Sequence, residues 1–261
     1  MTTMPVLFVG HGSPMNAIQD NPWSRAWRAL GQRLPRPRAI LCVSAHWETM
    51  GAQVTGAIAP PTIHDFYGFP QPLFDVRYPA PGDPVLAARI AGLLGDDAGI
   101  DPARGLDHGA WSVLLLMFPE ADIPVLQLGL DTRQPGAWHY ALAQRLAPLR
   151  DEGVLVMGSG DIVHNLRLFD FGNPQPLPWA LRFRDRVNAL IRARDHAALA
   201  NWHALGADAA LATPTPEHYL PLLYALALQR DDDRIECFND DVTGSISMTS
   251  LLLESASTGT P

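Results

Sequence analysis

Nine histidines are the side chains of this 261-residue sequence that point most directly to chemistry. Three of them come at or just after short apolar runs: His11 after "VLFVG", His46 in "AILCVSAHW" and His164 after "VLVMGSG". Imidazole is the commonest transition-metal ligand, and it can also exchange protons near neutral pH. For a single histidine in a glycine-rich turn or at a helix start, a structural role is favoured. Several in equivalent places favour a metal site.

The other six histidines divide into two groups. His218 stands in the first turn of an apolar helical segment, "PTPEHYLPLLYAL", His108 precedes another apolar helix in "DHGAW", and His64 lies in an aromatic loop. These three could join the metal site or simply cap and pack. The remaining three lie inside helical stretches, where surface or packing roles are favoured: His139, His196 and His203.

Competing catalytic motifs are weak. The sequence has no HExxH, and the triplet His46-Trp47-Glu48 resembles the HxE of zinc deaminases without the later cysteine pair. The turns "GHGSP" and "MGSGD" lack the GxGxxG spacing of a dinucleotide loop, and GxSxG is absent. Activation of Ser13 or Ser159 by a neighbouring histidine stays open as an alternative.

Short apolar runs alternating with helical segments predict an α/β fold, and near-continuous apolar runs predict central strands covered on both faces. The expected strands are 5–9, 39–45, 123–129, 153–158, 234–238 and 244–251. The expected helices are 22–33, 84–95, 108–118, 135–149, 178–194 and 216–229. Ligands bind at the carboxyl ends of the strands in an open parallel sheet, so histidines there would converge on one crevice.

Turn residues and one long loop complete this arrangement. Gly10 and Gly12 would let the chain turn sharply around His11. Residues 60–84 are rich in proline and aromatic residues, and a loop of this length without regular structure is typical of a lid or pocket wall. Its aromatic side chains could wall a planar substrate or equally form a local cluster: Phe66, Tyr67, Phe69 and Tyr78.

Composition excludes several classes of function. The net charge of −8 makes nucleic acid an unlikely partner, because phosphates demand a basic surface. The sequence has no lysine, which excludes a Schiff base to pyridoxal phosphate and a lysine-bearing phosphate loop. Two cysteines, no leader pattern and no membrane-length apolar run predict a cytoplasmic protein that does not bind membranes.

Domain organisation is simple in the sequence. No repeat or composition break divides it, so residues 1–254 are expected to form one catalytic domain and residues 255–261 a disordered tail. Nothing in the sequence indicates an oligomeric state.

Eight motifs in order carry a family resemblance. They are "GHGSPMN", "SAHWET", "PPTIHDFYGFP", "YPAPGDP", "DHGAWSVL", "ADIPVLQL", "DIVHNLR" and "PTPEHYLPLLYAL". Together they resemble the DODA-type extradiol aromatic ring-opening dioxygenases of the LigB-like superfamily, from about residue 5 to residue 250. The resemblance implies a single-domain α/β fold with a central mixed sheet between helical layers, and a mononuclear non-haem metal at the strand C-terminal ends.

The resemblance also implies roles for individual residues. His11, His46 and His218 match the family's metal ligands. His164 matches its active-site histidine, which acts as acid and base or completes the coordination of zinc, and His108 matches a second pocket histidine. Other extradiol enzymes use two histidines and a glutamate, and Glu217 stands beside His218, but the DODA-type pattern puts the ligand on His218.

The implied reaction is the insertion of O2 into a catechol such as 3,4-dihydroxyphenylalanine, giving a ring-opened semialdehyde. Fe(II) is the metal expected for activity, and Zn(II) suits the same histidines. Two alternatives belong to other classes. A zinc-dependent hydrolase could use the same site without O2, and a non-enzymatic binding protein on this fold would show an incomplete histidine set, whereas all the motif histidines are present here.

Overall fold

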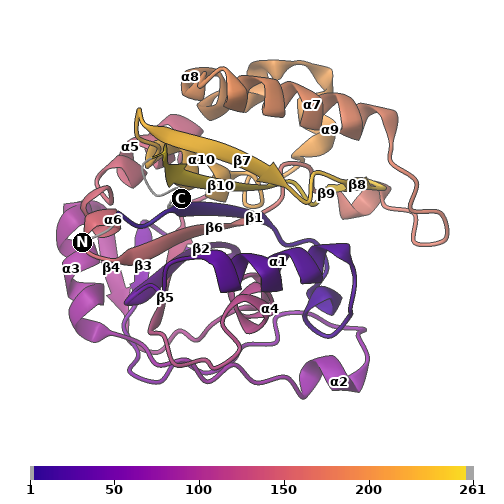
Figure 1. The fold of residues 1–261 in the computed structure, drawn as a ribbon. Helices are drawn as coiled ribbons and strands as arrows, with labels where there is room; N and C mark the ends of the chain where they lie inside the picture. Colours follow the sequence, from indigo (N-terminus) through magenta and orange to yellow (C-terminus); the bar gives the residue numbers. More distant parts are fainter. Residues whose placement is uncertain (1–2, 257–261) are drawn as a thin grey trace.

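An eight-stranded mixed sheet runs through the computed structural model, which describes residues 3–256 (Figure 1). The strand order is β4-β3-β5-β2-β6-β1-β10-β7, and β8 and β9 form a separate small hairpin. The strands are β1 (Val6–Gly10), β2 (Ala39–Glu48), β3 (Ala52–Thr55), β4 (Ala98–Asp101), β5 (Val125–Leu130), β6 (Val154–Gly160), β7 (Asp233–Phe238), β8 (Val242–Thr243), β9 (Ile246–Ser247) and β10 (Ser250–Ser255).

The four central strands, β5, β2, β6 and β1, are parallel to one another. Every residue of β1, β5 and β6 is buried, and so is β2 as far as Ala45. Apolar side chains alternate to both faces of such strands, so helices must cover each face. The parallel direction brings the carboxyl ends of all four strands to the same edge of the sheet.

Helices form a layer on each side of the sheet, and each layer has its own apolar core. α1 and α4 pack on one face, whereas α3, α5, α7 and α10 pack on the other. The α-helices are α1 (Pro22–Arg33), α2 (Gln71–Phe74), α3 (Pro84–Leu94), α4 (His108–Met117), α5 (Gly136–Gln144), α6 (Pro148–Asp151), α7 (Pro178–Arg192), α8 (His196–Ala200), α9 (Ala207–Ala212) and α10 (Leu220–Ala227). Short 3-10 helices span Pro14–Ala17, Gly95–Asp97, Leu166–Leu168 and Trp202–Leu205.

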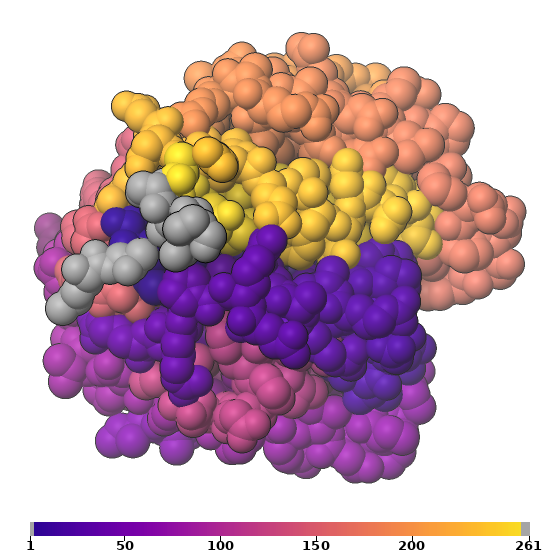
Figure 2. Space-filling view, in the orientation of Figure 1, coloured from indigo at the N-terminus to yellow at the C-terminus, as the bar shows by residue number. Residues whose placement is uncertain are grey.

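The first strand of the chain, β1, pairs with the last, β10. β10 pairs antiparallel with β1, and β7 extends the sheet beyond β10. Figure 2 shows the N-terminal and C-terminal parts of the chain side by side on this face. Arg33 of α1 donates a 2.8 Å hydrogen bond to Glu236 of β7 across this boundary.

The predicted fold class, a single α/β domain with a central mixed sheet between helical layers, is confirmed. α1 has the predicted bounds because Asn21 and Ser24 form a reciprocal capping box and Pro22 takes the first helical position. The expected helix 135–149 is wrong as one element. It divides into α5 and α6 at Pro148, whose missing N–H interrupts the hydrogen-bond ladder.

Other boundaries also differ from the prediction. The expected strand 244–251 is wrong, because Gly244 at φ 55° turns the chain between β8 and β9, and β10 begins only at Ser250. The edge strand β4 and its neighbour β3 were not expected, since each is four residues long and β4 has no fully buried residue. Ser255 and Ala256 of the predicted tail lie within the described chain, with Ser255 ending β10, and residues 257–261 lie outside it.

The long loop 60–84 contains one helical turn, α2, so the expectation that it lacks regular structure is wrong at that point. Tyr78 is fully buried, and its hydroxyl donates a 3.0 Å hydrogen bond to the Phe118 carbonyl oxygen. Tyr78 therefore anchors the loop to the core and does not wall a pocket. Among residues 3–256 there is no helix with the length and apolar character needed to span a membrane.

Candidate metal centre

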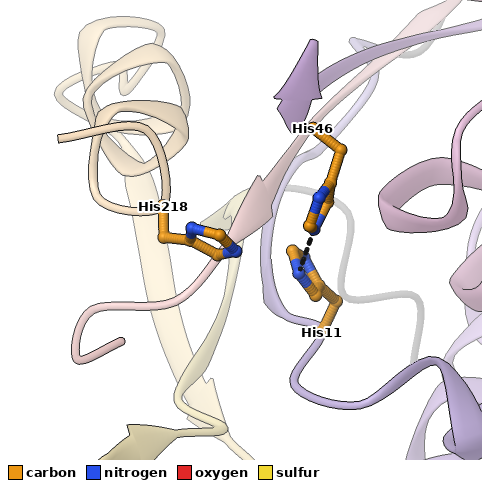
Figure 3. A group of neighbouring side chains, drawn as sticks. All are labelled: His11, His46 and His218. Carbon is orange, nitrogen blue, oxygen red and sulfur yellow. Dashed lines mark hydrogen bonds between the residues drawn. The ribbon is translucent and has the colours of Figure 1, made fainter. Parts of the chain in front are cut away.

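Three histidines from distant parts of the chain meet at the carboxyl edge of the sheet. His11 follows β1, His46 lies near the end of β2, and His218 lies in the turn before α10. Figure 3 shows the three rings facing one another from separate elements. The Nε2 atoms of His11 and His46 are 3.0 Å apart, and one ligand atom from each of the three histidines lies within 4.8 Å of the others.

Local backbone features bring these rings together. The pairing of β2 with β5 shifts register between Val43 and Glu48, and such irregularities re-aim side chains next to functional sites. β2 therefore extends past the predicted end at residue 45 and carries His46 in its irregular part. Gly12 adopts a φ of 57°, a left-handed conformation that favours glycine, in the turn directly after His11. The backbone of His218 packs so closely on Gly160 that a Cβ there would collide with the His218 carbonyl oxygen.

Each of the three histidines has an oxygen near its Nδ1 atom. His11 Nδ1 lies 3.0 Å from the Ser159 hydroxyl, which donates its own proton to the Gly109 carbonyl oxygen 2.6 Å away. Since the hydroxyl proton is used, Ser159 accepts a hydrogen bond from His11 Nδ1–H. Ser159 is thereby held as a partner of His11, which argues against its use as a nucleophile.

Carboxylates occupy the same position on the other two rings. Asp65 Oδ2 lies 3.6 Å from His46 Nδ1, and Glu217 Oε1 lies 3.1 Å from His218 Nδ1. A carboxylate or hydroxyl at one ring nitrogen holds the proton there and leaves the lone pair of the other nitrogen for a metal. All three Nδ1 atoms are therefore arranged to carry protons, and all three Nε2 atoms are available as ligands.

The Nε2 atoms are suited to a cation. His218 Nε2 is buried and has no hydrogen-bond partner among the described residues. Two lone pairs facing each other at 3.0 Å, as on His11 and His46, repel unless a proton or cation lies between them. Two nitrogens bound at about 2.0–2.1 Å in a tetrahedral site lie about 3.3 Å apart, close to this spacing. The residues present therefore fit a divalent metal ion.

Electrostatics favour the metal-binding form of these rings. Burial is the largest cause that lowers the pKa of His11 and of His218 well below the usual value, and the neighbouring histidines lower both further. Burial and His108 also lower the pKa of His46, against the opposing effect of Asp65. The rings are thus neutral at neutral pH, which is the protonation state that ligates metals.

His164 lies directly beside this group. Its ring stacks on that of His218, with centroids 3.4 Å apart and planes 8° from parallel. Its backbone N–H donates to the Ala212 carbonyl oxygen, which fixes the segment after β6. Burial, followed by the charge of His108, lowers the pKa of His164 to about 4. Its side chain has no hydrogen bond to any residue in the described part of the chain, so the ring is free to meet a substrate.

His108 opens α4 on the other side of the group. Its ring centroid is 3.9 Å from that of His46 and 5.8 Å from that of His11. Asp65 holds it in place, since one carboxylate oxygen accepts a 2.9 Å hydrogen bond from the His108 backbone N–H and lies 3.0 Å from its Nδ1. Burial raises the pKa of Asp65, but the contacts with His108 outweigh it and lower the pKa to about 2.

The structure separates the predicted site residues from the rest. The rings of five histidines lie close together at the carboxyl edge of the sheet: His11, His46, His108, His164 and His218. His64 lies apart, with its Nε2 3.0 Å from the Val76 carbonyl oxygen. Of the aromatic loop residues, Phe66 reaches His108 at 5.5 Å between ring centroids, whereas Tyr67 is 92% exposed. Phe69 packs on Phe66 at 5.3 Å between ring centroids.

Two carboxylates at the site were not singled out from the sequence. Asp65 and Asp161 both approach the histidines, and Asp161 Oδ2 lies 3.7 Å from His11 Nε2. In the sequence, Asp65 follows a histidine in an aromatic loop and Asp161 follows a glycine-rich turn. These neighbours were the only sequence signal that could have placed the two carboxylates at the site. Ser13, the other serine considered as a nucleophile, caps a 3-10 helix by accepting from the Met15 N–H.

Comparison with known proteins agrees with this geometry. Residues 5–249 match the family model described as the catalytic LigB subunit of aromatic ring-opening dioxygenase. The 4,5-DOPA dioxygenase extradiol of Escherichia coli K12 is 48% identical over 259 residues, covering 96% of this chain and 94% of that protein. The Beta vulgaris protein of the same name is 39% identical over 249 residues, covering 92% of each. The crystal structure of an uncharacterized Escherichia coli K12 protein aligns with a TM-score of 0.82 at 42% identity, covering 95% of this chain and 99% of that one.

Proposed function

This chain belongs to the LigB family of aromatic ring-opening dioxygenases and is an extradiol dioxygenase, and we propose that it opens a catechol ring of the 3,4-dihydroxyphenylalanine type. The reaction cleaves the ring C–C bond beside the diol and adds both atoms of O2, leaving an aldehyde and a carboxylic acid. The observation that carries this proposal is that one ring nitrogen from each of His11, His46 and His218 lies within 4.8 Å of the others, with the Nε2 atoms of His11 and His46 3.0 Å apart. The names of the relatives support the choice of substrate.

The enzyme depends on a metal, and its proposed ligands are His11, His46 and His218. We propose Fe(II) for the active form, because O2 chemistry requires a metal that can exchange electrons, and Zn(II) as a redox-inert occupant of the same nitrogen site. When bound, the metal would acidify the catechol hydroxyls and let electron density pass from the ring to O2. The protein contributes three neutral ligands held by Ser159 and two carboxylates.

His164 is the proposed acid and base. It is neutral at pH 7, it stacks on His218, and its nitrogens have no protein partner in the described chain. A ring in this position can remove one proton from a catechol hydroxyl and hold it for the later bond-breaking step. His108 is the second proposed catalytic residue, held by Asp65 against the opposite side of the group.

The substrate ring is proposed to lie between these histidines and the aromatic loop. Phe66 presents its ring edge-on to His108, at 78° between the ring planes. Phe66 is itself supported by Phe74 and Trp111 at centroid distances of 5.1 and 6.2 Å. A flat aromatic surface beside the acid and base groups suits a planar catechol.

A cytoplasmic location is also proposed. Cys42 is buried and Cys237 is exposed, and both are free thiols. Free thiols are typical of reducing compartments.

The test is anaerobic reconstitution of the purified protein with Fe(II), followed by O2 and a panel of catechols that includes 3,4-dihydroxyphenylalanine. We expect stoichiometric O2 uptake and a yellow ring-opened product. The same protein loaded with Zn(II) is expected to bind the metal and consume no O2. Absence of a ring-opened product from every catechol, with Fe(II) shown to be bound, contradicts the proposed substrate class.

A further inference from the structure

Asp161 is a buried carboxylate that the proposed reaction does not use. It follows β6 directly, its side chain is fully buried, and its backbone N–H donates a 2.9 Å hydrogen bond to the His218 carbonyl oxygen. Its Oδ1 accepts a 3.1 Å hydrogen bond from the Gly12 N–H. Its Oδ2 has no hydrogen-bond partner among the described residues. An unpartnered buried carboxylate oxygen is costly unless a proton or a cation lies against it.

The unpartnered oxygen lies beside His11, one of the three proposed ligands. Asp161 Oδ2 lies 3.7 Å from His11 Nε2, the atom that also faces His46 Nε2 at 3.0 Å. One ligand atom each from Asp161, His164 and His218 lies within 4.8 Å of the others. Asp161 thus differs from Asp65 and Glu217, whose oxygens lie at the Nδ1 atoms on the outer side of the rings.

Charge balance links these observations. Three neutral imidazoles leave the two positive charges of a divalent metal uncompensated in a buried site, and burying an unpaired charge is unfavourable. The carboxylate at Asp161 is the buried group whose free oxygen can supply negative charge at that point. We propose that Asp161 is a fourth protein ligand of the substrate-free metal centre. This inference rests on the metal site of the proposed function.

A fourth protein ligand would reduce the number of coordination positions open to catechol and O2. Three protein ligands leave three coordination positions open, as in the facial triad of oxygenases. With a metal bound, Asp161 would hold one of these positions in the substrate-free enzyme and would have to leave it for catechol and O2. Gly12 N–H holds Oδ1, so the carboxylate stays anchored in the site after Oδ2 moves away.

Metal affinity and the absorption spectrum of the Co(II)-loaded protein test the proposal. Asp161→Asn keeps the shape of the side chain and removes its charge. We expect it to weaken Co(II) binding by more than about 100-fold, beyond the 10–100-fold range of groups that only orient ligands. Its d-d bands should shift, because one oxygen ligand is replaced. The Co(II) affinity is measured by competition with a chelator. Neither this measurement nor the spectrum requires turnover.

Glu217→Gln is the matched control. It neutralises a carboxylate that contacts His218 at Nδ1, outside the ligand atoms. We expect a loss of affinity within about 10–100-fold and d-d bands at the wild-type positions. If Asp161→Asn behaves in the same way as Glu217→Gln, Asp161 is not a ligand and the proposal is overturned.

A measurement on the unmutated protein covers the case in which Asp161→Asn fails to fold. In a crystal structure of the Zn(II)-loaded, substrate-free enzyme, we expect Asp161 Oδ2 at about 2.0–2.2 Å from the metal. A separation beyond about 3 Å, outside any coordination distance, overturns the proposal. These outcomes can be told apart from a failure of the proposed function. If Asp161 binds the metal but the enzyme opens no catechol, the proposed function is contradicted and the role of Asp161 is not.

Discussion

A comparison of two buried histidines, His139 and His218, shows how a structural imidazole differs from one in a candidate metal site. His139 in α5 is completely buried, with Nδ1 2.9 Å from the Tyr224 hydroxyl and Nε2 3.1 Å from the Asp131 carbonyl oxygen. His218 is also buried, but its Nε2 has no partner in the described chain. Burial lowers the pKa of both residues. Neither burial nor a shifted pKa therefore marks the site.

The difference lies in what the second nitrogen meets. Both nitrogens of His139 are used within the protein, so its hydrogen-bonding capacity is complete. In the strand-end group one nitrogen is held by an oxygen and the other faces further imidazoles. A buried polar atom without a partner costs free energy, so a fold that keeps several together must use them for a ligand. The following predictions test this comparison, from the largest expected effect to the smallest.

Removing a proposed ligand should have the largest effect. In His218→Ala the metal loses one of three nitrogens, and we expect turnover to fall on the order of 10³-fold or more, beyond the range for outer groups. The matched control is His139→Gln, which changes a histidine outside the site and should leave the metal bound. Metal content per chain and O2 uptake after anaerobic Fe(II) reconstitution measure both effects. Full metal occupancy in His218→Ala would remove the distinction between the two groups.

Replacing His164 by alanine should separate chemistry from binding. Loss of an acid and base group lowers turnover by about 10²–10⁴-fold, and the metal should stay bound because the three other histidines are intact. The readouts are kcat and metal content on the same sample. If the metal is lost together with turnover, His164 is a ligand, and the group uses four histidines instead of three.

We expect His139, the structural histidine, to make the stability of the protein depend on pH. His139 has a pKa of about 4 in the folded protein and an ordinary value near 6.5 when unfolded, because burial disfavours its charged form. The unfolded chain therefore takes up a proton first as the pH falls. The stabilisation that His139 contributes is complete above pH 6.5 and is lost progressively towards pH 4, by up to about 3 kcal/mol.

The control for this effect is His139→Gln, because glutamine does not titrate. Urea unfolding of the two metal-free proteins between pH 7 and pH 4 gives the difference between their free energies of unfolding. The other buried histidines contribute equally to both curves, so the difference isolates His139. A difference that stays constant with pH would mean that His139 is not held neutral by the fold.

Much of this comparison was visible in the sequence. Apolar runs predicted the central strands, and glycine-rich turns after them put His11 and His164 at the edge where parallel strands end. His139 lay in a helical stretch, and a packing role was predicted for it, in agreement with its two internal contacts. Periodicity and capping are local signals, and they succeed where local structure determines position.

The carboxylates were out of reach of such signals. Asp65 and Asp161 matter because of which nitrogen each one faces, and that depends on contacts between residues distant in the chain. The edge strand β4 and its neighbour β3 were missed for a related reason. They are short, and pairing with neighbours in the sheet, rather than an apolar pattern of their own, determines their conformation.

The smallest effect is expected at Asp65, which orients two histidines without facing the point where the Nε2 atoms meet. Its carboxylate lies 3.6 Å from His46 Nδ1 and 3.0 Å from His108 Nδ1. Asp65→Asn keeps an oxygen for the His108 backbone N–H but loses the charge that favours a proton on each Nδ1. We expect metal affinity and kcat to fall within the 10–100-fold range of orienting groups.

Asp75→Asn supplies the control from the same loop. The Asp75 carboxylate accepts a hydrogen bond from the exposed Gln71 side chain, so this variant should change neither quantity. Chelator competition and steady-state kinetics measure both variants. A loss at Asp65 as large as in His218→Ala would mean that its carboxylate binds the metal directly. The metal ligands would then be His46, His108 and Asp65, whose ligand atoms also lie within 4.8 Å of one another. A loss within the orienting range keeps the three Nε2 atoms as the metal-binding set, with Asp65 determining which nitrogen of His46 carries the proton.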